Sequence, residues 1–461
     1  MKGLEEGKTG SIESEVLEKI RPTKLQIRVL GLFIKTIKDK INECMRTRGI
    51  DVIVEEEGSY AKGTLLRDKW EVDLFVLFKD TSDEWISLHS KDLLTECLKN
   101  LPYLIKYSQH PYITVSFMGL EADIVPALYI EKPRKKGLGV ERTPFHTKYI
   151  NYKLEEYQKD EVRLLKSFLK GIGVYGAESY IAGFSGYLSE LLILYYGNFI
   201  NTIYNISRWR KGIVIDIEGN GDYKELKRKY KNSTIIVVDP VDPRRNVAAS
   251  ISEKSYYYAV LASKLYMRKP SKYFFHIYST NKKVSLELPS IVVRCKGRYF
   301  DRPPQDIRGR LKRITESIES YLKQYNYNPL KSSFYFDDLE NIYLGFLFED
   351  INKSKIEIMS GPKIEKCDAD SAANFIKKRL KENGFVFING DSLKGISPRK
   401  KDNAVSLINK FVKEQKGLLP KETEECNVVL VINPKNVVFR EDAKKWIVDS
   451  LYSMPAWIID I

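Results

Sequence analysis

The sequence has few of the features that mark membrane, zinc-binding or secreted proteins. Its longest apolar run lies around Leu188 to Tyr196, far short of the roughly 20 residues that span a bilayer. The five cysteines stand far apart, without a CxxC pair or a His-rich tract that would indicate zinc, and their odd number argues against a disulfide framework. The first residues, MKGLEEGKTG, include acids and no apolar core, so they do not form a signal peptide. We therefore expect a protein of the reducing cytoplasm without a membrane segment.

The composition favours a nucleic-acid partner. Lys and Arg number 76 against 61 Asp and Glu, which gives a net charge of +15, and the chain has 29 Tyr and 20 Phe. Cations neutralise phosphates, and aromatic rings stack on bases. A Lys-rich solvated surface accounts for the same surplus equally well. The 461 residues are too many for one hydrophobic core, so the chain is expected to form several domains.

A small-residue turn followed by an acidic strand is the most informative segment. Gly58 and Ser59 open the stretch GSYAKGTLLRDKWEVDLFVLF. Side chains alternate along a strand, so Glu71 and Asp73 are expected on one face, with the apolar residues between them on the buried face. Two carboxylates at one strand end suit a hard cation, above all Mg²⁺. The turn before them offers backbone N–H groups and a hydroxyl to a phosphate chain.

A third acid lies on a predicted hairpin. The segments 113–117 and 120–125 alternate like strands and flank a Met-Gly turn. Asp123 stands between apolar residues of the second strand, where an acid is out of place unless something binds it. Three clustered acids repel one another and need cations to be stable together. The alternative interpretation is that all three are solvated edge-strand acids.

The expected fold class is α+β with several domains. The regions are a flexible N-terminus (1–14), a mixed sheet with helices (15–140), a mainly helical region (141–275) and a C-terminal α/β region (276–461). Helices of the middle region are expected at 160–170, 179–196, 200–211 and 246–267. The C-terminal region opens in a βαββ order typical of a ferredoxin-like or RRM-like layer. Its helix at 305–324 carries a basic face of Arg308, Arg310, Lys312 and Arg313.

These motifs resemble a known family. A GS turn, an E-x-D strand and a lone strand Asp are the signature of the polymerase-β-like nucleotidyltransferase superfamily. The sequence resembles the archaeal class I CCA-adding enzymes, tRNA nucleotidyltransferases, over about residues 20–270 and weakly beyond. The motifs that carry this resemblance are Glu141–His146 (ERTPFH), Asp160–Lys166 (DEVRLLK), Gly173–Glu178 (GVYGAE), Gly183–Leu192 (GFSGYLSELL) and Val237–Asn246 (VVDPVDPRRN).

The resemblance implies a function and a set of site residues. It implies template-independent addition and repair of the 3′-terminal CCA of tRNA from CTP and ATP, with two Mg²⁺ ions and release of pyrophosphate. Glu71 and Asp73 would bridge both ions, and Asp123 would hold the ion that activates the RNA 3′ hydroxyl. The nucleotide-binding residues would be Gly58, Ser59, Lys62, His146, Lys166, Tyr175 and Arg245, the last reading the base. Residues 15–140 would be the catalytic domain, 141–275 would bind nucleotide, and 276–461 would grip the acceptor stem and T arm of tRNA. Related enzymes are often dimers, so a homodimer is expected by analogy.

Simpler roles remain open for several of these residues. Lys62 and Lys166 are plain solvated lysines in the alternative interpretation, and His146 is a local hydrogen-bonding residue. Asp242 or Asn246 is expected to cap the helix that follows. Three other functions also remain open. They are a poly(A) polymerase or oligoadenylate synthetase with the same acids, a catalytically silent RNA-binding protein, and an enzyme that transfers nucleotides to a small molecule.

Overall fold

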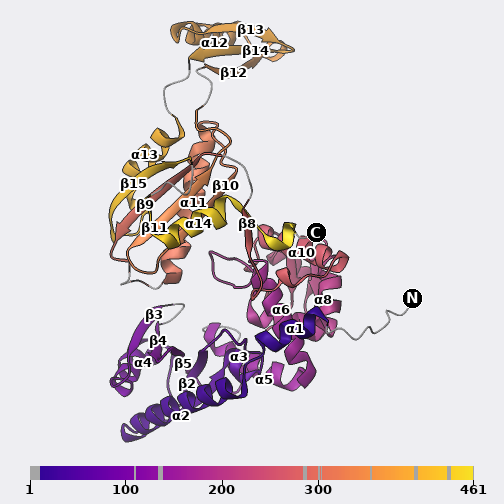
Figure 1. Cartoon of the computed structure of the whole chain (residues 1–461), viewed down its shortest axis with the longest axis vertical. Coiled ribbons are helices and arrows are strands. Elements are labelled where there is room, and N and C mark those ends of the chain that lie inside the picture. The colour runs from indigo at the N-terminus through magenta and orange to yellow at the C-terminus, as the bar shows by residue number, and fades with distance from the viewer. Residues whose placement is uncertain are drawn as a thin grey trace, which may run out of the picture. The chain divides into compact units, whose positions relative to one another are not determined.

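The computed structural model of the chain divides into two compact units (Figure 1). The first comprises Met1–Lys282 and Pro455–Ile461, and the second Lys283–Met454. The described residues are 11–107, 111–132, 139–283, 288–299, 302, 304–352, 356–398, 403–432 and 438–459. Residues 1–10 of the expected flexible N-terminus lie outside this set. Ile12–Ser14 of that segment belong instead to helix α1 (Ile12–Ile20), which Ser11 caps.

The acids lie on a five-stranded sheet in the first unit. Its strands are β1 (Val52–Glu57), β2 (Glu71–Phe78), β3 (Tyr103–Tyr107), β4 (Pro111–Phe117) and β5 (Leu120–Leu128). The order is β1-β2-β5-β4-β3, with β2 and β5 parallel and the other pairs antiparallel. The predicted hairpin is confirmed: Met118 and Gly119 both have positive φ between β4 and β5, as a tight two-residue hairpin turn requires.

Two helices cover one face of this sheet (Figure 1). They are α2 (Lys24–Thr47) and α4 (Asp83–Cys97), capped by the side chains of Thr23 and Ser82. Their apolar stripes pack on Val72, Leu74, Val76 and Phe78, the alternate residues of β2. The acids of β2 occupy the intervening positions, so strand alternation turns them to the opposite face.

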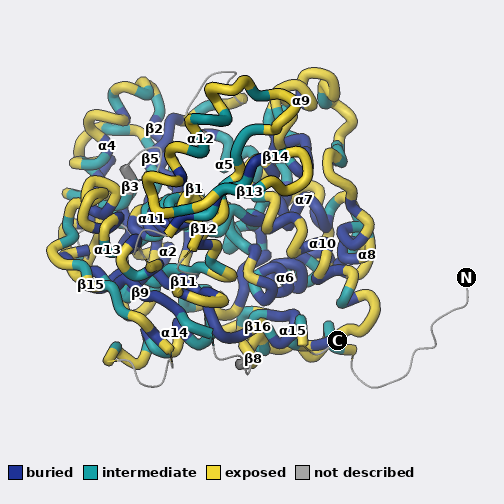
Figure 2. Tube along the Cα trace, turned by 90° about the horizontal axis from the view of Figure 1, so that it is seen from above, coloured by how far each residue is buried: buried dark blue, intermediate teal, exposed yellow. Residues whose placement is uncertain are grey.

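The rest of the first unit is mainly helical. Its helices are α3 (Gly58–Ala61), α5 (Thr143–Lys153), α6 (Glu156–Gly171), α7 (Gly186–Tyr196), α8 (Phe199–Ile206), α9 (Tyr223–Lys229), α10 (Glu253–Arg268) and α15 (Ala456–Ile459). A short parallel pair, β6 (Ile213–Ile215) and β7 (Ile235–Val237), accompanies them. One hydrophobic core joins α6, α7, α8 and α10, and α6 is largely dark blue in Figure 2. Trp457 of α15 is fully buried in that core.

Two helices start later than the sequence predicts, and α6 starts earlier, at Glu156 instead of residue 160. Helix α7 begins at Gly186 after the N-cap Ser185, not at Ser179, because Gly183 and Phe184 run back along Val174 and Gly176 through backbone hydrogen bonds. Helix α10 begins at Glu253 after the N-cap Ser252. The prediction that Asp242 or Asn246 caps this helix is therefore wrong.

The second unit has the strand order of ferredoxin-like folds. Its elements in sequence are β9 (Ser290–Gly297), α11 (Pro304–Gln324), β10 (Lys331–Phe336), β11 (Asn341–Leu347), α13 (Ala404–Glu414) and β15 (Thr423–Val431). The antiparallel sheet order is β10-β11-β9-β15, which matches a βαββαβ arrangement. Helices α11 and α13 pack on one face, and α14 (Glu441–Leu451) packs on the other.

A small layer is inserted between β11 and α13. It consists of β12 (Ile356–Lys363), α12 (Ala369–Lys381), β13 (Phe385–Asn389) and β14 (Ser392–Pro398), in the sheet order β12-β14-β13. Gly395 of β14 lies against Phe375 and Arg379 of α12, so the helix covers one face of this sheet. Phe385 and Ile396 pair in register and belong to the other face.

Two disulfides correct the expectation from the cysteine count. Cys44 bonds to Cys97 and Cys295 to Cys426, while Cys367 is free. The first pair forms where α2 packs beside α4, and the second joins directly opposed residues of β9 and β15. The partners are 53 and 131 residues apart in sequence, so spacing gives no sign of them. Within the described residues, no helix has the length and apolar character needed to cross a membrane.

Candidate active site

Asp73 and Asp123 lie side by side on the sheet face opposite α2 and α4. Asp73 of β2 is in register with Asp123 of the parallel strand β5. Glu71 lies two residues before Asp73 and therefore shares its face. The structure thus brings the two aspartates together as the sequence predicts. The carboxylate of the half-exposed Glu71 instead forms an ion pair with Lys69, Nζ to Oε1 2.6 Å.

Burial and like charge act on both aspartates. Burial first, then the neighbouring charges of Asp123 and Glu71, raises the pKa of Asp73 to about 6. Burial also raises the pKa of Asp123, against a 2.5 Å hydrogen bond that the Thr114 hydroxyl donates to its carboxylate. Two adjacent carboxylates in this environment favour protonation or a bound cation.

The local geometry fits a divalent cation. Among the described residues, the carboxylate of Asp73 has no hydrogen bond or ion pair. Gly58 has φ +68°, and a Cβ there would lie 1.8 Å from Oδ2 of Asp73. Any residue other than glycine would therefore clash with this carboxylate. In the residues that the structure describes, no three His, Cys, Asp or Glu side chains already stand close enough to hold a metal. A third ligand requires Glu71 to leave Lys69.

Glu57 is an acid that the sequence reasoning missed. It is the last residue of β1 and pairs in register with Asp73, so Glu57, Asp73 and Asp123 form a row across three strands. It is 2% exposed, and its Oε2 has no hydrogen-bond partner among the described residues. Burial raises the pKa of Glu57 to about 7. The signal was present in the sequence as the last acid of the EEE run before Gly58.

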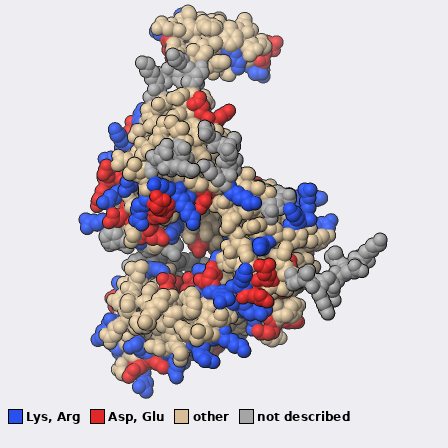
Figure 3. Space-filling view, viewed as in Figure 1, with Lys and Arg blue, Asp and Glu red and all other residues tan. Residues whose placement is uncertain are grey.

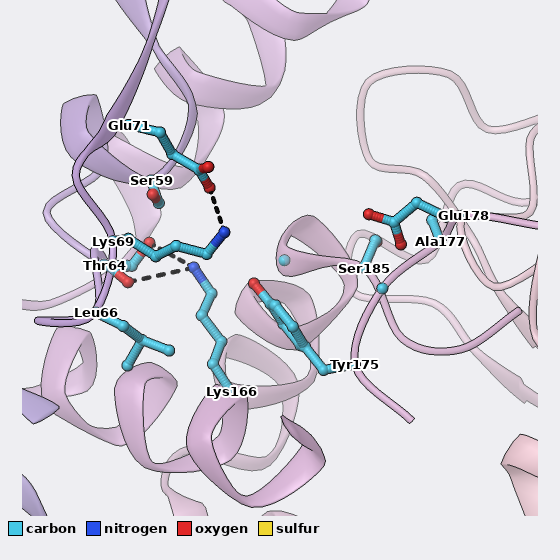
Figure 4. Close-up of a pocket in the computed structure, with 12 residues that line it drawn as sticks. Ser59, Thr64, Leu66, Lys69, Glu71, Lys166, Tyr175, Ala177, Glu178 and Ser185 are labelled. Carbon is cyan, nitrogen blue, oxygen red and sulfur yellow. Dashed lines mark hydrogen bonds and ion pairs between the residues drawn. The ribbon is translucent and has the colours of Figure 1, made fainter. Parts of the chain in front are cut away.

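A cavity of about 400 Å³ opens beside Glu71 (Figure 4). Three of the predicted nucleotide-binding residues line it: Ser59, Lys166 and Tyr175. Figure 4 shows the Tyr175 hydroxyl and the Lys166 ammonium directed toward the same space, with Lys69 reaching to Glu71. The acid-bearing strand and the predicted phosphate-binding residues therefore share one cavity.

Lys62 and Lys166 meet at a buried carboxylate. Glu190 of α7 is 0% exposed and accepts from Lys62 Nζ at 2.5 Å and from Lys166 Nζ at 3.0 Å. Thr64 donates its hydroxyl to Glu190 at 2.7 Å and accepts from Lys166 at 2.8 Å. Neither lysine is the solvated surface group of the alternative interpretation, since they are 7% and 2% exposed.

His146 and Arg245 meet at a second buried carboxylate. Asp239 follows β7, is fully buried, and contacts His146 Nε2 at 3.0 Å and Arg245 at 2.7 Å. The Tyr187 hydroxyl donates to the same carboxylate at 3.2 Å. Burial raises the pKa of Asp239, but the contacts with His146 and Arg245 outweigh it and leave that pKa at about 2. Asp239 is therefore ionised and orients both predicted ligands.

Tyr187 connects the two clusters. Its ring stacks on His146 with centroids 4.1 Å apart, and Lys62 Nζ lies 5.7 Å from the ring centre. The predicted residues thus form one continuous set of contacts from the cavity to Arg245. Sequence reasoning quoted the motifs that contain Glu190, Asp239 and Tyr187 without giving these residues a role. The available signals were a Glu inside the apolar run of α7 and an Asp directly after a buried strand.

The acid row, the adjacent cavity and the two-part first unit define a nucleotidyltransferase. The family description "Nucleotidyltransferase domain" matches residues 38–146, "tRNA nucleotidyltransferase, second domain" residues 160–276, and "CCA-adding enzyme, C-terminal domain" residues 300–426. The chain is 44% identical over 394 residues to the CCA-adding enzyme of Aeropyrum pernix, covering 84% of each chain. It is 35% identical over 404 residues to that of Saccharolobus islandicus, covering 87% of this chain and 92% of the other. The chain belongs to the family of archaeal CCA-adding enzymes.

Solved structures resemble the chain less closely. The Cid1 poly(U) polymerase with Mg and 3′-dATP bound covers 57% of this chain at 16% identity, with a TM-score of 0.44. At this distance the likeness carries no conclusion about the site.

Proposed function

We propose that this enzyme adds and repairs the 3′-terminal CCA of tRNA, using CTP and ATP, two Mg²⁺ ions and no nucleic-acid template. The observation that carries the proposal is the in-register pair Asp73 and Asp123 on the strands β2 and β5, with Glu71 of β2 lining a cavity together with Lys166 and Tyr175, in a chain 44% identical to a CCA-adding enzyme. Carboxylates supply metal ligands, and buried cations supply partners for a triphosphate.

The three predicted acids, Glu71, Asp73 and Asp123, have distinct tasks in the transfer. When bound, the two ions stabilise charge on the attacking and leaving oxygens of an in-line displacement. Glu71 and Asp73 would hold both ions, and Asp123 the ion beside the 3′ hydroxyl. The 3′ oxygen of the RNA attacks the α-phosphorus, the bond from that phosphorus to the bridging oxygen breaks, and pyrophosphate leaves. Asp123 accepts the hydroxyl proton.

The remaining predicted residues hold the nucleotide. Ser59, Lys62, Lys166 and Tyr175 contact the triphosphate, and Gly58 lets it approach the backbone. Arg245 reads the base, because its planar fork can hydrogen-bond cytosine or adenine. His146 stacks on Tyr187 and shares the Asp239 carboxylate with Arg245, which supports a common base and sugar site.

The second unit supplies surfaces that suit tRNA. The exposed ring of Phe385 lies near that of Phe387, with centroids 6.2 Å apart, on the open face of β13. Lys394 of β14 pairs in register with Phe387 on this face. Aromatic rings and a cation together suit stacked bases and phosphate. We assign binding of the acceptor stem and T arm of tRNA to this unit. Of the predicted basic residues of α11, Arg313 is exposed, whereas Arg308 pairs with Asp338.

The compartment and assembly are further parts of the proposal. A cytoplasmic location follows from a tRNA substrate. The two disulfides do not oppose it, because intracellular proteins of hyperthermophilic archaea carry such bonds. A homodimer is proposed by analogy with related enzymes.

The test is extension of a tRNA that lacks its terminal residues, with CTP and ATP supplied singly and together. We expect addition of CCA followed by a stop, and loss of incorporation in Asp73→Asn and Asp123→Asn with tRNA binding retained. Glu84→Gln is the control, because Glu84 is an exposed carboxylate of α4, which covers the other face of the sheet. Continued A-tailing would instead indicate a poly(A) polymerase or oligoadenylate synthetase. No extension of the RNA by the unaltered chain would indicate a silent RNA-binding protein, or transfer to a small molecule if nucleotide is still consumed.

A further inference from the structure

The buried Glu190 accepts hydrogen bonds from three side chains, of which Thr64 and Lys166 line the cavity. Its Oε2 accepts from Lys62, and its Oε1 accepts from both Lys166 and Thr64. The three donors come from different places: Lys62 and Thr64 from the segment between α3 and β2, and Lys166 from α6. A single carboxylate on α7 therefore fixes the acid-bearing part of the first unit against the helical part.

The charge balance at this point is unusual for a buried site. Two ammonium groups share one hydrogen-bonded carboxylate, that of Glu190. Burial raises the pKa of Glu190, but Lys166 and Lys62 outweigh burial and lower that pKa to about 2. Burial lowers the pKa of Lys166 to about 8, against the attraction of Glu190. Without the carboxylate, two buried cations would face each other unpaired, an arrangement that costs several kcal/mol.

The hydrogen bonds of the two ammonium groups show how many N–H groups of each lysine remain free to bind a phosphate. Lys166 uses three donors, on Glu190 Oε1 and on the hydroxyl and carbonyl of Thr64, the last at 3.3 Å. An ammonium has three N–H groups, so Lys166 gives up its longest bond when it meets a new anion. Lys62 has one hydrogen bond in the described residues, to Glu190, and keeps two donors.

We propose that Glu190 is a positioning residue that sets where Lys62 and Lys166 meet the triphosphate. Each ammonium is held by one oxygen of the carboxylate, so the geometry of Glu190 determines their separation and direction. This inference rests on the proposed function, which places the triphosphate at these lysines. Glu190 itself contacts neither nucleotide nor metal and acts through the two cations.

Comparison of nucleoside triphosphate with monophosphate binding isolates this role. The full chain with Mg²⁺ and without tRNA is titrated calorimetrically with CTP, ATP and CMP. In Glu190→Gln we expect CTP and ATP affinities to fall about tenfold, as for loss of hydrogen bonds to a charged group, with CMP affinity unchanged. A merely structural role would weaken CTP and CMP together, since CMP has the base and sugar but lacks the β- and γ-phosphates. An unchanged ratio of CTP to CMP affinity would overturn the inference.

Two further variants make the result specific. Glu161→Gln is the matched control: Glu161 is a carboxylate of α6 that accepts from the Phe199 backbone N at 2.7 Å and touches neither lysine. Its CTP to CMP ratio should equal that of the unaltered chain. The double variant Glu190→Gln/Lys166→Met should lose less CTP affinity than the two single variants added together, because part of the effect of Glu190→Gln passes through Lys166 and the rest through Lys62. Full additivity would contradict the role.

Failure of the inference and failure of the proposed function give different results. If Lys166→Met lowers the ratio of CTP to CMP affinity and Glu190→Gln does not, the assigned triphosphate site is supported and the proposed role of Glu190 is wrong. If neither changes the ratio, the assigned triphosphate site is wrong.

Should Glu190→Gln not fold, Glu190→Asp keeps the charge but is one methylene too short to reach both lysines. That variant should lower the same ratio, and an unchanged ratio would overturn the inference.

Discussion

At the scale of single residues, the site contains more negative charge than its own cations balance. Glu57, Asp73 and Asp123 form one row across β1, β2 and β5. Lys69 forms its ion pair with Glu71, which lies two residues before Asp73 on β2 and outside the row. Like charges so arranged repel, and a divalent cation relieves this repulsion more than a protein ammonium can. The residues around the row therefore respond to metal and to pH.

Lys69 should compete with metal for Glu71. A cation must displace the Lys69 ammonium before Glu71 is available, so Lys69→Met is expected to tighten Mn²⁺ binding in the absence of nucleotide. The gain should be a few-fold, since exposed ion pairs contribute up to about 1 kcal/mol. Electron paramagnetic resonance of free Mn²⁺ measures the affinity. Lys79→Met is the control, because Lys79 pairs with Asp51 at 3.1 Å on another surface. Equal affinity in both variants would contradict the competition.

Glu57 should make stability depend on pH. Burial raises its folded pKa to about 7 from 4.5. Its stabilising contribution is therefore complete below pH 4.5 and is lost as pH rises through 7. Glu57→Gln is expected to be more stable than the unaltered chain by about 2–3 kcal/mol at pH 8 and no more stable at pH 4. Urea unfolding at both pH values measures this, with Glu18→Gln as control, because Glu18 is an exposed carboxylate of α1. A difference that is the same at both pH values would exclude the ionisation of Glu57 as its cause.

Residue-level prediction from sequence succeeded where one strand or hairpin fixes the direction of a side chain. Alternation and the two-residue turn determine the face of each strand on which Asp73 and Asp123 lie, whereas the expectation that the two acids meet comes from the family resemblance, because β2 and β5 are not consecutive strands. Prediction failed where a partner lies in another element. Lys166 has the pattern of a helix-edge lysine, and only Glu190, 24 positions later on α7, makes its burial stable. No local pattern contains that pairing.

At the scale of elements, the strong apolar periodicities were reliable and the starting points of helices were not. The predicted helix at 305–324 corresponds to α11, and the acidic strand to β2. Asn246 misled the prediction for α10. Its side chain accepts from Val237 N and donates to Ile235 O, both of β7. A side chain that bonds a neighbouring strand has the same sequence signature as a helix cap, so tertiary contacts alone distinguish them.

The disulfide between α2 and α4 should stabilise the acid-bearing sheet. It closes a loop of 53 residues, for which the chain-entropy relation gives about 4 kcal/mol. Cys97→Ser is therefore expected to lower the melting temperature, and reductant should lower that of the unaltered chain. Cys367→Ser removes the free thiol and should change nothing. Mass spectrometry of the unreduced chain checks the pairing. Melting that is insensitive to both reductant and Cys97→Ser would show that the bond does not form.

At the scale of the whole molecule, the neighbours of each charged residue decide what the basic surplus means. Figure 3 shows Lys and Arg interspersed with Asp and Glu on the visible face. The surplus of +15 is therefore informative about the partner only where cations lack acidic neighbours. The composition alone left a solvated surface and an RNA-binding surface as equal alternatives, because ion pairs such as Arg308 with Asp338 cannot be counted from sequence. The structure separates paired from unpaired cations residue by residue.

Salt dependence tests whether unpaired cations bind tRNA. Each phosphate contact releases counterions, so log affinity should fall linearly with log salt, and six to ten contacts would reduce affinity by about 10³–10⁵ between 50 and 200 mM.

Arg313 of α11 is exposed and, in the described residues, forms no ion pair. Arg313→Ala should therefore reduce the slope by about one unit if it meets a phosphate. Arg298→Ala is the comparison, because Arg298 is exposed but lies 3.8 Å from Glu424, and it should change the slope less. Filter binding of tRNA at several salt concentrations measures both. A flat salt response of the unaltered chain would mean that shape and stacking, rather than phosphate contacts, hold the tRNA.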